Sequence, residues 1–400
     1  MAQNTEQQPP RAALARSGLL DAAPGPLHPQ ARETLIAALD AGWADPRRLH
    51  REARQAGALL NQARAVFADD LGVRPSEVTF HHGGGPAALA AALDGLAHAR
   101  RRHGARLVAS AIEHSVILET GTYAAAQAGD PALLATVPVD RVGRLDLSAW
   151  RAAVNTPGTA VAALQHANGE VGTIQPVEAA QEACRESGVP LLVDGSASVG
   201  RVPAPAAYDL LVADAATVGG PPVGLLVSPE RVPFSRSGRH REPEFGRADA
   251  PMWIPLALAA AEAWQQHRAV ATADAEQAWA ITARLRSAAS QLVDVDVAGD
   301  GTQRLPHIVA FSALFADGET LVHELDRLGL AVASGSACTS STLRPSHVLA
   351  AMGVLTHGNV RVTLPIAAVA PSRGADVDRL VAELPGLLAR VRRQLGTDAL

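Results

Sequence analysis

The fold of this chain is limited first by the way short apolar runs alternate with helical stretches. Helical patterns at residues 31–41, 54–71 and 87–101 precede the apolar runs, which are bounded by turn residues. The runs lie at residues 106–110, 160–165, 190–194, 210–213 and 224–227. Apolar runs of this length between helices are typical of parallel strands that are buried on both faces. The pattern predicts a large α/β domain over residues 31–268.

A smaller α+β domain is predicted for residues 269–400. A long helical region at residues 255–292 leads into it. A strand–helix–strand pattern, a further strand and an amphipathic C-terminal helix then follow, at residues 307–311, 319–328, 331–334, 359–364 and 375–395. This mixture of elements is typical of an α+β unit. Residues 1–16 are polar and contain a proline pair, so we expect a disordered tail there.

The composition indicates a globular protein without a nucleic-acid or membrane partner. Of the 400 residues, 48% are apolar and 19% are charged, which supports a large and a small core side by side. The formal net charge of −5 is spread along the sequence without an arginine-rich block. We therefore expect small molecules or proteins as partners. The apolar stretches are too short to cross a bilayer and the N-terminus is polar, which predicts a cytoplasmic location.

The basic residues are unusual because all 35 of them are arginines and the chain contains no lysine. A codon bias that also enriches alanine, glycine and proline explains a surface without lysine. It does not supply a side-chain amine where a reaction needs one.

The two cysteines, Cys184 and Cys338, are too far apart in sequence to indicate a disulfide framework or a clustered metal site. Cys184 lies in an amphipathic helical pattern, where a small core residue is the expected role. The adjacent His81 and His82 have no third candidate ligand nearby in sequence, so we predict no metal site.

Cys338 lies in the segment SGSACTSSTLRPSHVLAAMG, residues 334–353, where small polar residues follow a predicted strand. This setting suits an exposed loop thiol, and the spacing alone leaves open whether the cysteine is incidental or functional. The segment SGSACTS followed by LxPSxVLxAxG resembles the active-site loop of the NifS/IscS-like cysteine desulfurases, in the class-V aminotransferase family. The resemblance implies that Cys338 accepts sulfur as a persulfide.

The resemblance extends over residues 19–395 and implies pyridoxal phosphate (PLP) as the family's cofactor. Three segments carry it further: SAIEHSVILET, ALQHANGEVGTIQPV and LLVDGSASVGRVP. They imply that His114 stacks on the PLP ring, that Asn168 keeps a cofactor-binding position and that Asp194 pairs with the ring nitrogen. Arg361, in NVRVTLP, matches the arginine that binds the substrate carboxylate. From the residues alone, a core histidine, a turn aspartate and a surface arginine remain open.

The family fold implied by the resemblance is the PLP-dependent transferase type I fold. It has a large domain with a mostly parallel sheet of the seven-stranded type and a small α+β domain built from both chain ends. The analogy assigns residues 17–30 to the small domain, together with residues 269–400, which carry the Cys338 loop. It also implies a dimer.

The sequence departs from the family where PLP would be held. In DLLVADAATVGGPPVG, Thr217 takes the place of the Schiff-base lysine, Ala216 that of a histidine and Asp214 that of a phosphate-binding serine. In HHGGGPA, Gly85 replaces a phosphate-binding threonine, and Ala197 stands where a glutamine would bind the ring hydroxyl.

These departures disfavour PLP energetically. Each lost donor to the phosphate costs about 1.5–3 kcal/mol. A carboxylate about 4 Å from a unit charge adds a repulsion of about 4 kcal/mol at an effective dielectric constant near 20. The turn at residues 83–85 could still offer backbone N–H groups, and Asp249 aligns loosely with a threonine that reaches the partner subunit's phosphate. Without an amine, covalent PLP is impossible, and non-covalent PLP is disfavoured.

Three functions remain in view. The favoured one is a pseudo-desulfurase that acts as a partner or persulfide relay through Cys338, as a homodimer or as a heterodimer with an active desulfurase, with a sulfur-acceptor protein as a further partner. The second is a PLP-independent enzyme that uses His114, Asp194, Thr217 and Arg361. The third is a cysteine desulfurase or lyase that binds PLP non-covalently.

Overall fold

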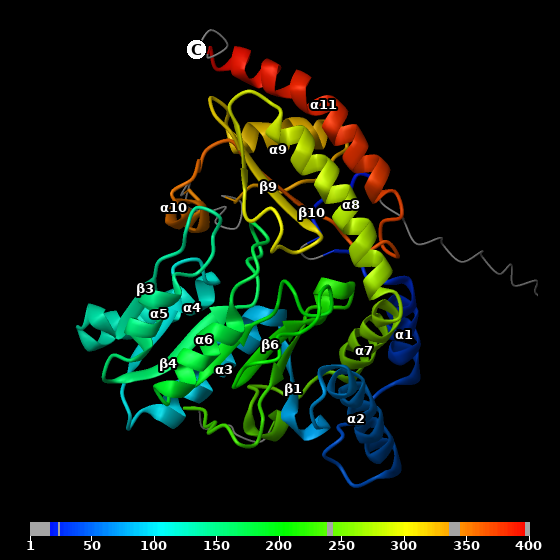
Figure 1. The fold of residues 1–400 in the computed structure, drawn as a ribbon. Helices are drawn as coiled ribbons and strands as arrows, with labels where there is room; N and C mark the ends of the chain where they lie inside the picture. Colours follow the sequence, from blue (N-terminus) through cyan, green and yellow to red (C-terminus); the bar gives the residue numbers. More distant parts are fainter. Residues whose placement is uncertain (1–16, 23–24, 238–242, 336–344, 397–400) are drawn as a thin grey trace, which may run out of the picture.

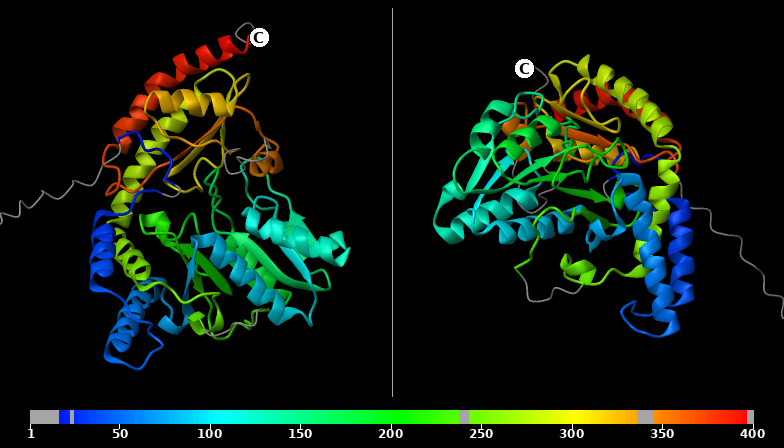
Figure 2. Two further views of the ribbon diagram at one scale, coloured as in Figure 1. Left: turned by 180° about the vertical axis from the view of Figure 1, so that it is seen from behind. Right: turned by 60° about the horizontal axis from the view of Figure 1, so that its bottom comes forward.

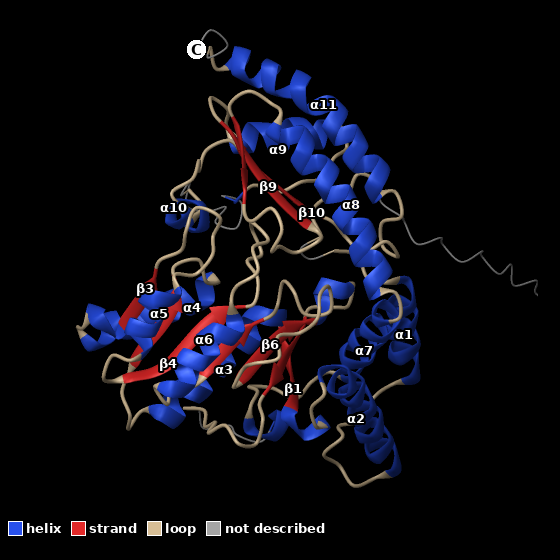
Figure 3. Ribbon diagram, in the orientation of Figure 1, coloured by secondary structure: helices blue, strands red, loops and turns tan. Residues whose placement is uncertain are grey.

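The chain forms two β-sheets of unequal size (Figures 1 and 3). The structure is a computed structural model and describes residues 17–22, 25–237, 243–335 and 345–396. The predicted tail at residues 1–16 and Cys338 therefore lie outside the described residues. None of the helices in these ranges is long and apolar enough to cross a membrane.

The larger sheet has seven strands in the order β1-β7-β6-β5-β4-β2-β3. The pairs β2–β3, β2–β4, β4–β5 and β5–β6 are parallel, whereas β7 pairs antiparallel with both β6 and β1. The mostly parallel sheet of the prediction is thus confirmed. Its strands are β1 (Val78–His82), β2 (Arg106–Ser110), β3 (Leu134–Val137), β4 (Thr159–Gln165), β5 (Leu191–Asp194), β6 (Leu210–Asp214) and β7 (Val223–Val227).

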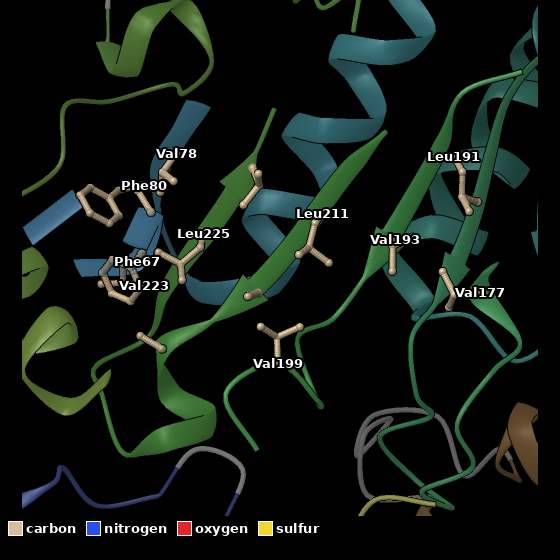
Figure 4. Close-up of a cluster of buried hydrophobic side chains, with 14 of the residues drawn as sticks. Phe67, Val78, Phe80, Val177, Leu191, Val193, Val199, Leu211, Val223 and Leu225 are labelled. Atoms are coloured by element: carbon tan, nitrogen blue, oxygen red, sulfur yellow. The ribbon is translucent and has the colours of Figure 1, made fainter. Parts of the chain in front are cut away.

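Helices cover both faces of this sheet, and buried side chains form a separate hydrophobic cluster on each face. One cluster draws on α2, α5, α6 and α7, and the other on α3 and α4. Figure 4 shows part of the first cluster, including Leu191 and Val193 of β5, while Leu192 between them faces the second. The helices are α2 (Arg51–Leu71), α3 (Gly84–Arg100), α4 (Ser115–Ala128), α5 (Leu147–Val154), α6 (Val177–Glu186) and α7 (Ile254–Arg268).

The smaller sheet has three antiparallel strands in the order β10-β9-β8 and its own hydrophobic cluster. Its strands are β8 (Val295–Ala298), β9 (Ile308–Ala313) and β10 (Asn359–Thr363). The helices in this part of the chain are α8 (Ala271–Ser290), α9 (Gly318–Arg327), α10 (His347–Met352) and α11 (Arg373–Gln394). Leu20 is buried in this cluster, and isolated bridges join Leu19 to Ala331 and Asp21 to Thr363. The start of the described chain therefore packs against the small sheet. The division into two domains stays a prediction.

Three local features differ from the sequence-based expectation. The helical region at residues 255–292 is two helices, α7 and α8, which pack against different elements. Helix α1 (Pro29–Ala41) and α2 run alongside α7 (Figure 2), whereas α8 packs on the small sheet. Strands β1, β3 and β8 were not expected, and residues 331–334 form isolated bridges instead of a strand.

The edge strand β1 is held by a buried ion pair. The backbone N–H of Phe80 donates to the carboxylate of Glu244 at 3.0 Å, and Arg64 pairs with the same oxygen at 2.7 Å. The side chains of Arg64 and Glu244 are 4% and 3% exposed. Glu244 has a φ of 52°, in the left-handed region that a glutamate rarely adopts. This pair therefore ties the segment around residue 244 to the edge of the sheet.

We expect Glu244→Ala to lower the free energy of unfolding by about 3–5 kcal/mol, because it leaves the Arg64 charge buried without its partner. Urea unfolding measures the loss. The matched control is Glu230→Ala, which breaks an exposed pair with Arg74 at 3.0 Å and should change stability by about 1 kcal/mol or less. Equal effects of the two substitutions would contradict the role given to the buried pair.

Candidate functional site

The predicted site residues lie at one edge of the large sheet. Asp194 and Asp214 are the last residues of the neighbouring parallel strands β5 and β6. His114 follows β2, and Asn168 follows β4. In open α/β sheets, ligands bind outside the carboxyl ends of parallel strands. The sheet therefore gathers these four positions where a ligand site is expected.

Gly85 joins the same edge through β1. Strand β1 is antiparallel to β7, and β7 is antiparallel to β6, so β1 ends at the same side as β6. The turn that follows β1 opens helix α3, and its Gly83 and Gly84 have φ values of 90° and 73°. A Cβ atom on Gly84 would lie 2.4 Å from Oδ2 of Asp214. The turn thus needs glycine both for its conformation and for this close approach.

The Asp214 carboxylate is bound by backbone N–H groups from two elements. Gly85 donates to Oδ2 at 2.7 Å, and Ala216 donates to Oδ1 at 2.9 Å. Burial raises the pKa of Asp214 to about 6, and the charge of Asp194 adds to the increase. The sequence predicted that the turn could still offer its N–H groups to a ligand. In the structure, the N–H of Gly85 is already taken by Asp214.

Thr217 lies on the short 3₁₀ turn Ala215–Val218, which Asp214 caps. Its hydroxyl donates to the carbonyl oxygen of Ser196. The N–H of Ser196 in turn donates to Oδ1 of Asp194 at 2.9 Å. Asp194, Ser196 and Thr217 therefore form one hydrogen-bonded chain across the ends of β5 and β6. The hydroxyl of Thr217 serves to join these two loops.

Asn168 uses its whole side chain within the protein. Its amide nitrogen donates to the carbonyl oxygen of Ile112 at 3.2 Å and to Oε1 of Gln165 at 3.3 Å. Its Oδ1 accepts from the backbone N–H groups of Glu170 and Val171, both at 2.8 Å. These four bonds use both amide hydrogens and both lone pairs. Asn168 therefore shapes the turn after β4.

His114 follows β2 and Ala197 follows β5, so both lie at the same end of the sheet as the other site residues. Nδ1 of His114 accepts from the N–H of Val116 at 3.1 Å, so the ring caps helix α4. Ala197 faces the turn after β4, since a Cβ atom on Gly169 would lie 3.4 Å from the Cβ of Ala197. The small residues at 169 and 197 thus pack against each other.

Arg361 lies on strand β10 of the small sheet and interacts with acidic residues of two other segments. Its Nη2 lies 3.8 Å from Oδ1 of Asp21. Burial raises the pKa of Glu170, while a hydrogen bond from Ser346 and the positive charge of Arg361 act in the opposite direction. Arg361 is thus close to carboxylates from both the chain start and the turn after β4.

Two polar residues near these positions, Glu113 and Ser196, were not predicted by the sequence analysis. Glu113 is fully buried, and burial raises its pKa well above the ordinary value. Its Oε1 accepts from the N–H of Gln165 at 2.9 Å, whereas Oε2 has no hydrogen-bond partner among the described residues. The hydroxyl oxygen of Ser196 is also buried without a partner in that part of the chain. Both residues lie in segments that carry the family resemblance, SAIEHSVILET and LLVDGSASVGRVP, but the sequence alone does not show that they are buried.

The remaining candidates make none of the contacts described above. Cys184 is buried in α6, and burial raises the pKa of its thiol to about 12. Asp249 is exposed and pairs with Arg236 at 2.6 Å. His81 is buried and His82 is exposed, and the residues placed by the structure contain no group of three or more side chains suited to a metal.

PLP, the cofactor implied by the resemblance, does not fit the residues present. Position 217 offers no amine, and its hydroxyl is engaged with Ser196. The backbone group expected at the phosphate is engaged with a carboxylate from Asp214. The position of the family's Schiff-base lysine and the positions that bind the phosphate of PLP are therefore both altered in this chain.

Comparison with known proteins gives consistent results. The family model described as aminotransferase class-V matches residues 19–220. A cysteine desulfurase of Cereibacter sphaeroides is 33% identical, over 92% of this chain and 94% of its own. An IscS-like cysteine desulfurase of Mycobacterium tuberculosis is 32% identical, over 93% of this chain and 96% of its own.

Solved structures agree on the fold. A NifS-like protein superposes with a TM-score of 0.82 at 22% identity, covering 94% of this chain and 100% of its own. The apo cysteine desulfurase from Thermococcus onnurineus superposes with a TM-score of 0.77 at 20% identity, covering 94% of this chain and 95% of its own. On the family match and the identity to its relatives, this chain belongs to the PLP-dependent class-V aminotransferase family, among homologues of the NifS/IscS-like cysteine desulfurases.

Proposed function

We propose that this protein is a pseudo-desulfurase, a member of the desulfurase scaffold that performs no PLP chemistry of its own. The observation that carries the proposal is Thr217. It stands at the family's lysine position, in a chain without any lysine, and its hydroxyl is bonded to the carbonyl of Ser196. A threonine hydroxyl forms no imine with an aldehyde. The retained fold then serves a purpose other than catalysis through PLP.

That purpose is a partnership with an active desulfurase, in which Cys338 relays sulfur to an acceptor protein. The Cys338 thiolate attacks the terminal sulfur of a persulfide on the active enzyme. A new S–S bond to Cys338 forms, and the S–S bond on the donor breaks. The donor cysteine leaves as a thiolate and takes up the proton that Cys338 released. The exchange is balanced without an added oxidant or reductant.

Absence of covalent PLP is the first expected outcome. The purified protein, incubated with PLP and reduced with borohydride, should carry no pyridoxyl group on any side chain, because it has no side-chain amine to reduce onto. Intact-mass and peptide mass measurements check this, with an active desulfurase treated in parallel as the positive control. A pyridoxyl group on any internal residue would refute the proposal.

The second expected outcome is that the two cysteines differ in reactivity. Under native conditions, iodoacetamide should label Cys338 and leave Cys184 unmodified, because the Cys184 thiol is buried with a pKa raised to about 12. After denaturation both should react. The Cys338→Ser protein should take up no label in the native state, and preferential labelling of Cys184 would contradict the assignment.

The third expected outcome is transfer of sulfur from an active desulfurase to Cys338. After incubation with an active desulfurase from the same organism and cysteine, Cys338 should gain one sulfur atom, and the Cys338→Ser variant should gain none. Native mass spectrometry of the same mixture should show a complex of the two chains or a homodimer of this one. A strictly monomeric species in every sample would defeat the partner role.

A further inference from the structure

We propose that two buried histidines, His267 and His307, form an acid-sensitive switch between the two sheets. While both rings are neutral, the side chains around them hold the two parts of the chain together. Protonation of the rings in mild acid loosens this contact and releases the turn that carries Thr217. The inference does not rest on the proposed function, because it involves neither PLP nor Cys338.

The switch lies in a group of polar side chains, here called the junction, that come from both sheets. Arg201 follows β5, and His267 lies in α7, which packs on the large sheet. Asp274 lies in α8, His307 directly precedes β9 and Arg373 begins α11, so these three belong to the small sheet and its helices. All five residues are buried, with exposed fractions between 2% and 5%. The junction therefore joins the two sheets away from water.

Asp274 is the carboxylate of the junction, and it faces two arginines. Its Oδ1 pairs with Arg373 at 2.9 Å, and its Oδ2 lies 3.7 Å from Arg201. The guanidinium groups also donate to backbone carbonyls, Arg373 to Pro365 at 2.7 Å and Arg201 to Leu364 at 3.2 Å. The junction thus has more positive than negative charge while its histidines are neutral. A further proton adds to that excess.

The groups around His307 are positive. Burial lowers the pKa of His307 well below its ordinary value, and the charges of Arg201, Arg373 and Arg304 lower it further. His267 acts in the same direction, so a proton on one ring opposes a proton on the other. His307 is therefore held in its neutral form at neutral pH.

The surroundings of His267 are mixed, but burial dominates them. Burial lowers the pKa of His267 to about 4, and the charges of Arg201 and His28 act in the same direction. The charge of Asp274 and a hydrogen bond with the backbone of Gly200 act against this decrease. His267 is therefore neutral at pH 7 and becomes charged only in acid.

The hydrogen bonds of the two rings also disfavour a second proton. Nε2 of His267 and Nδ1 of His307 are buried without a hydrogen-bond partner among the described residues. In the charged imidazolium both ring nitrogens are donors, so at each ring a buried N–H would lack an acceptor. Burial also lowers the pKa of His28, but the charge of Glu262 opposes it. We therefore assign the switch to His267 and His307.

The junction is connected to the candidate site through Arg201. This side chain donates to the carbonyl oxygen of Thr217 at 3.4 Å and to that of Leu364 at the end of β10. The N–H of Leu364 donates to the carbonyl oxygen of His307 at 2.8 Å, and β10 carries Arg361. A charged His307 repels Arg201, so acid should loosen both the Thr217 turn and the end of β10.

The sign of the pH dependence follows from the lowered pKa values. A histidine in the unfolded chain has a pKa of about 6.5, so below this pH the unfolded chain binds more protons than the folded one. Stability is therefore fully present above about pH 6.5 and is lost as the pH falls toward the folded pKa, which is about 4 for His267. For each histidine, the folding equilibrium constant should fall by up to about tenfold per pH unit in this range.

The first experiment measures urea unfolding between pH 7.5 and 4.5 for the wild type, His267→Gln, His307→Gln and the double variant. Glutamine can form hydrogen bonds but does not take up a proton. Each single substitution should reduce the loss of the folding equilibrium constant by about tenfold per pH unit, and the double substitution by about a hundredfold. His323→Gln, on the exposed face of α9, is the matched control and should keep the wild-type dependence. A wild-type dependence in the double variant would overturn the inference.

The second experiment uses the wild type, so it decides the question even if a variant does not fold. Hydrogen exchange is followed by mass spectrometry at pH 7 and pH 5, with correction for the intrinsic exchange rates. Residues 200–219 and 364–373 should exchange at least about tenfold faster at pH 5, whereas residues 160–165 in the large sheet should keep their protection. Unchanged exchange in the first two segments, or an equal loss of protection in all three, would refute the switch. Neither result would affect the Thr217 and Cys338 tests.

Discussion

The parallel pairing of β4, β5 and β6 determines where the loops that carry the site residues lie. Gln165 pairs with Asp194, and Asp194 pairs with Val212, so the three strands end at one edge of the sheet. The loops that follow must meet there. Because hydrophobic clusters cover both faces of the sheet, its stability comes from apolar burial that requires no cofactor. The fold of the sheet therefore does not depend on a lysine at position 217.

Most polar groups of the site form hydrogen bonds with other groups of the same chain. Thr217 bonds to the carbonyl of Ser196, Ser196 bonds to Asp194, and Asn168 makes four bonds within the chain. Buried polar groups are costly when they are left without partners, so these contacts stabilise the cleft in its present form. Buried oxygens of the site that still lack partners among the described residues include Oε2 of Glu113, Oε1 of Glu170 and Oγ of Ser196.

The sequence predicted the parts of this structure that depend on local pattern. Five of the seven strands of the large sheet coincide with apolar runs in the sequence, and these five were predicted. The other two lack such a run, because β1 ends in two histidines and β3 is a short edge strand of partly exposed residues. The family motifs singled out His114, Asn168 and Asp194, which the structure places after β2, after β4 and at the end of β5. It did not reveal that Asp214 occupies the N–H of Gly85, because the two residues are 129 positions apart in sequence. That contact follows from the strand order, which places β1 and β6 on either side of β7.

The backbone at position 217 is also held by a buried arginine. Arg201 donates to the carbonyl oxygen of Thr217 at 3.4 Å and to that of Leu364 at 3.2 Å. Arg201 and Arg373 both lie near Asp274, with nitrogen–oxygen distances of 3.7 and 2.9 Å, and all three side chains are buried. Arg201 thus holds the turn through the backbone carbonyl of Thr217. The bond from Arg201 and the cap from Asp214 use backbone groups of the turn, so they do not depend on which side chain stands at position 217.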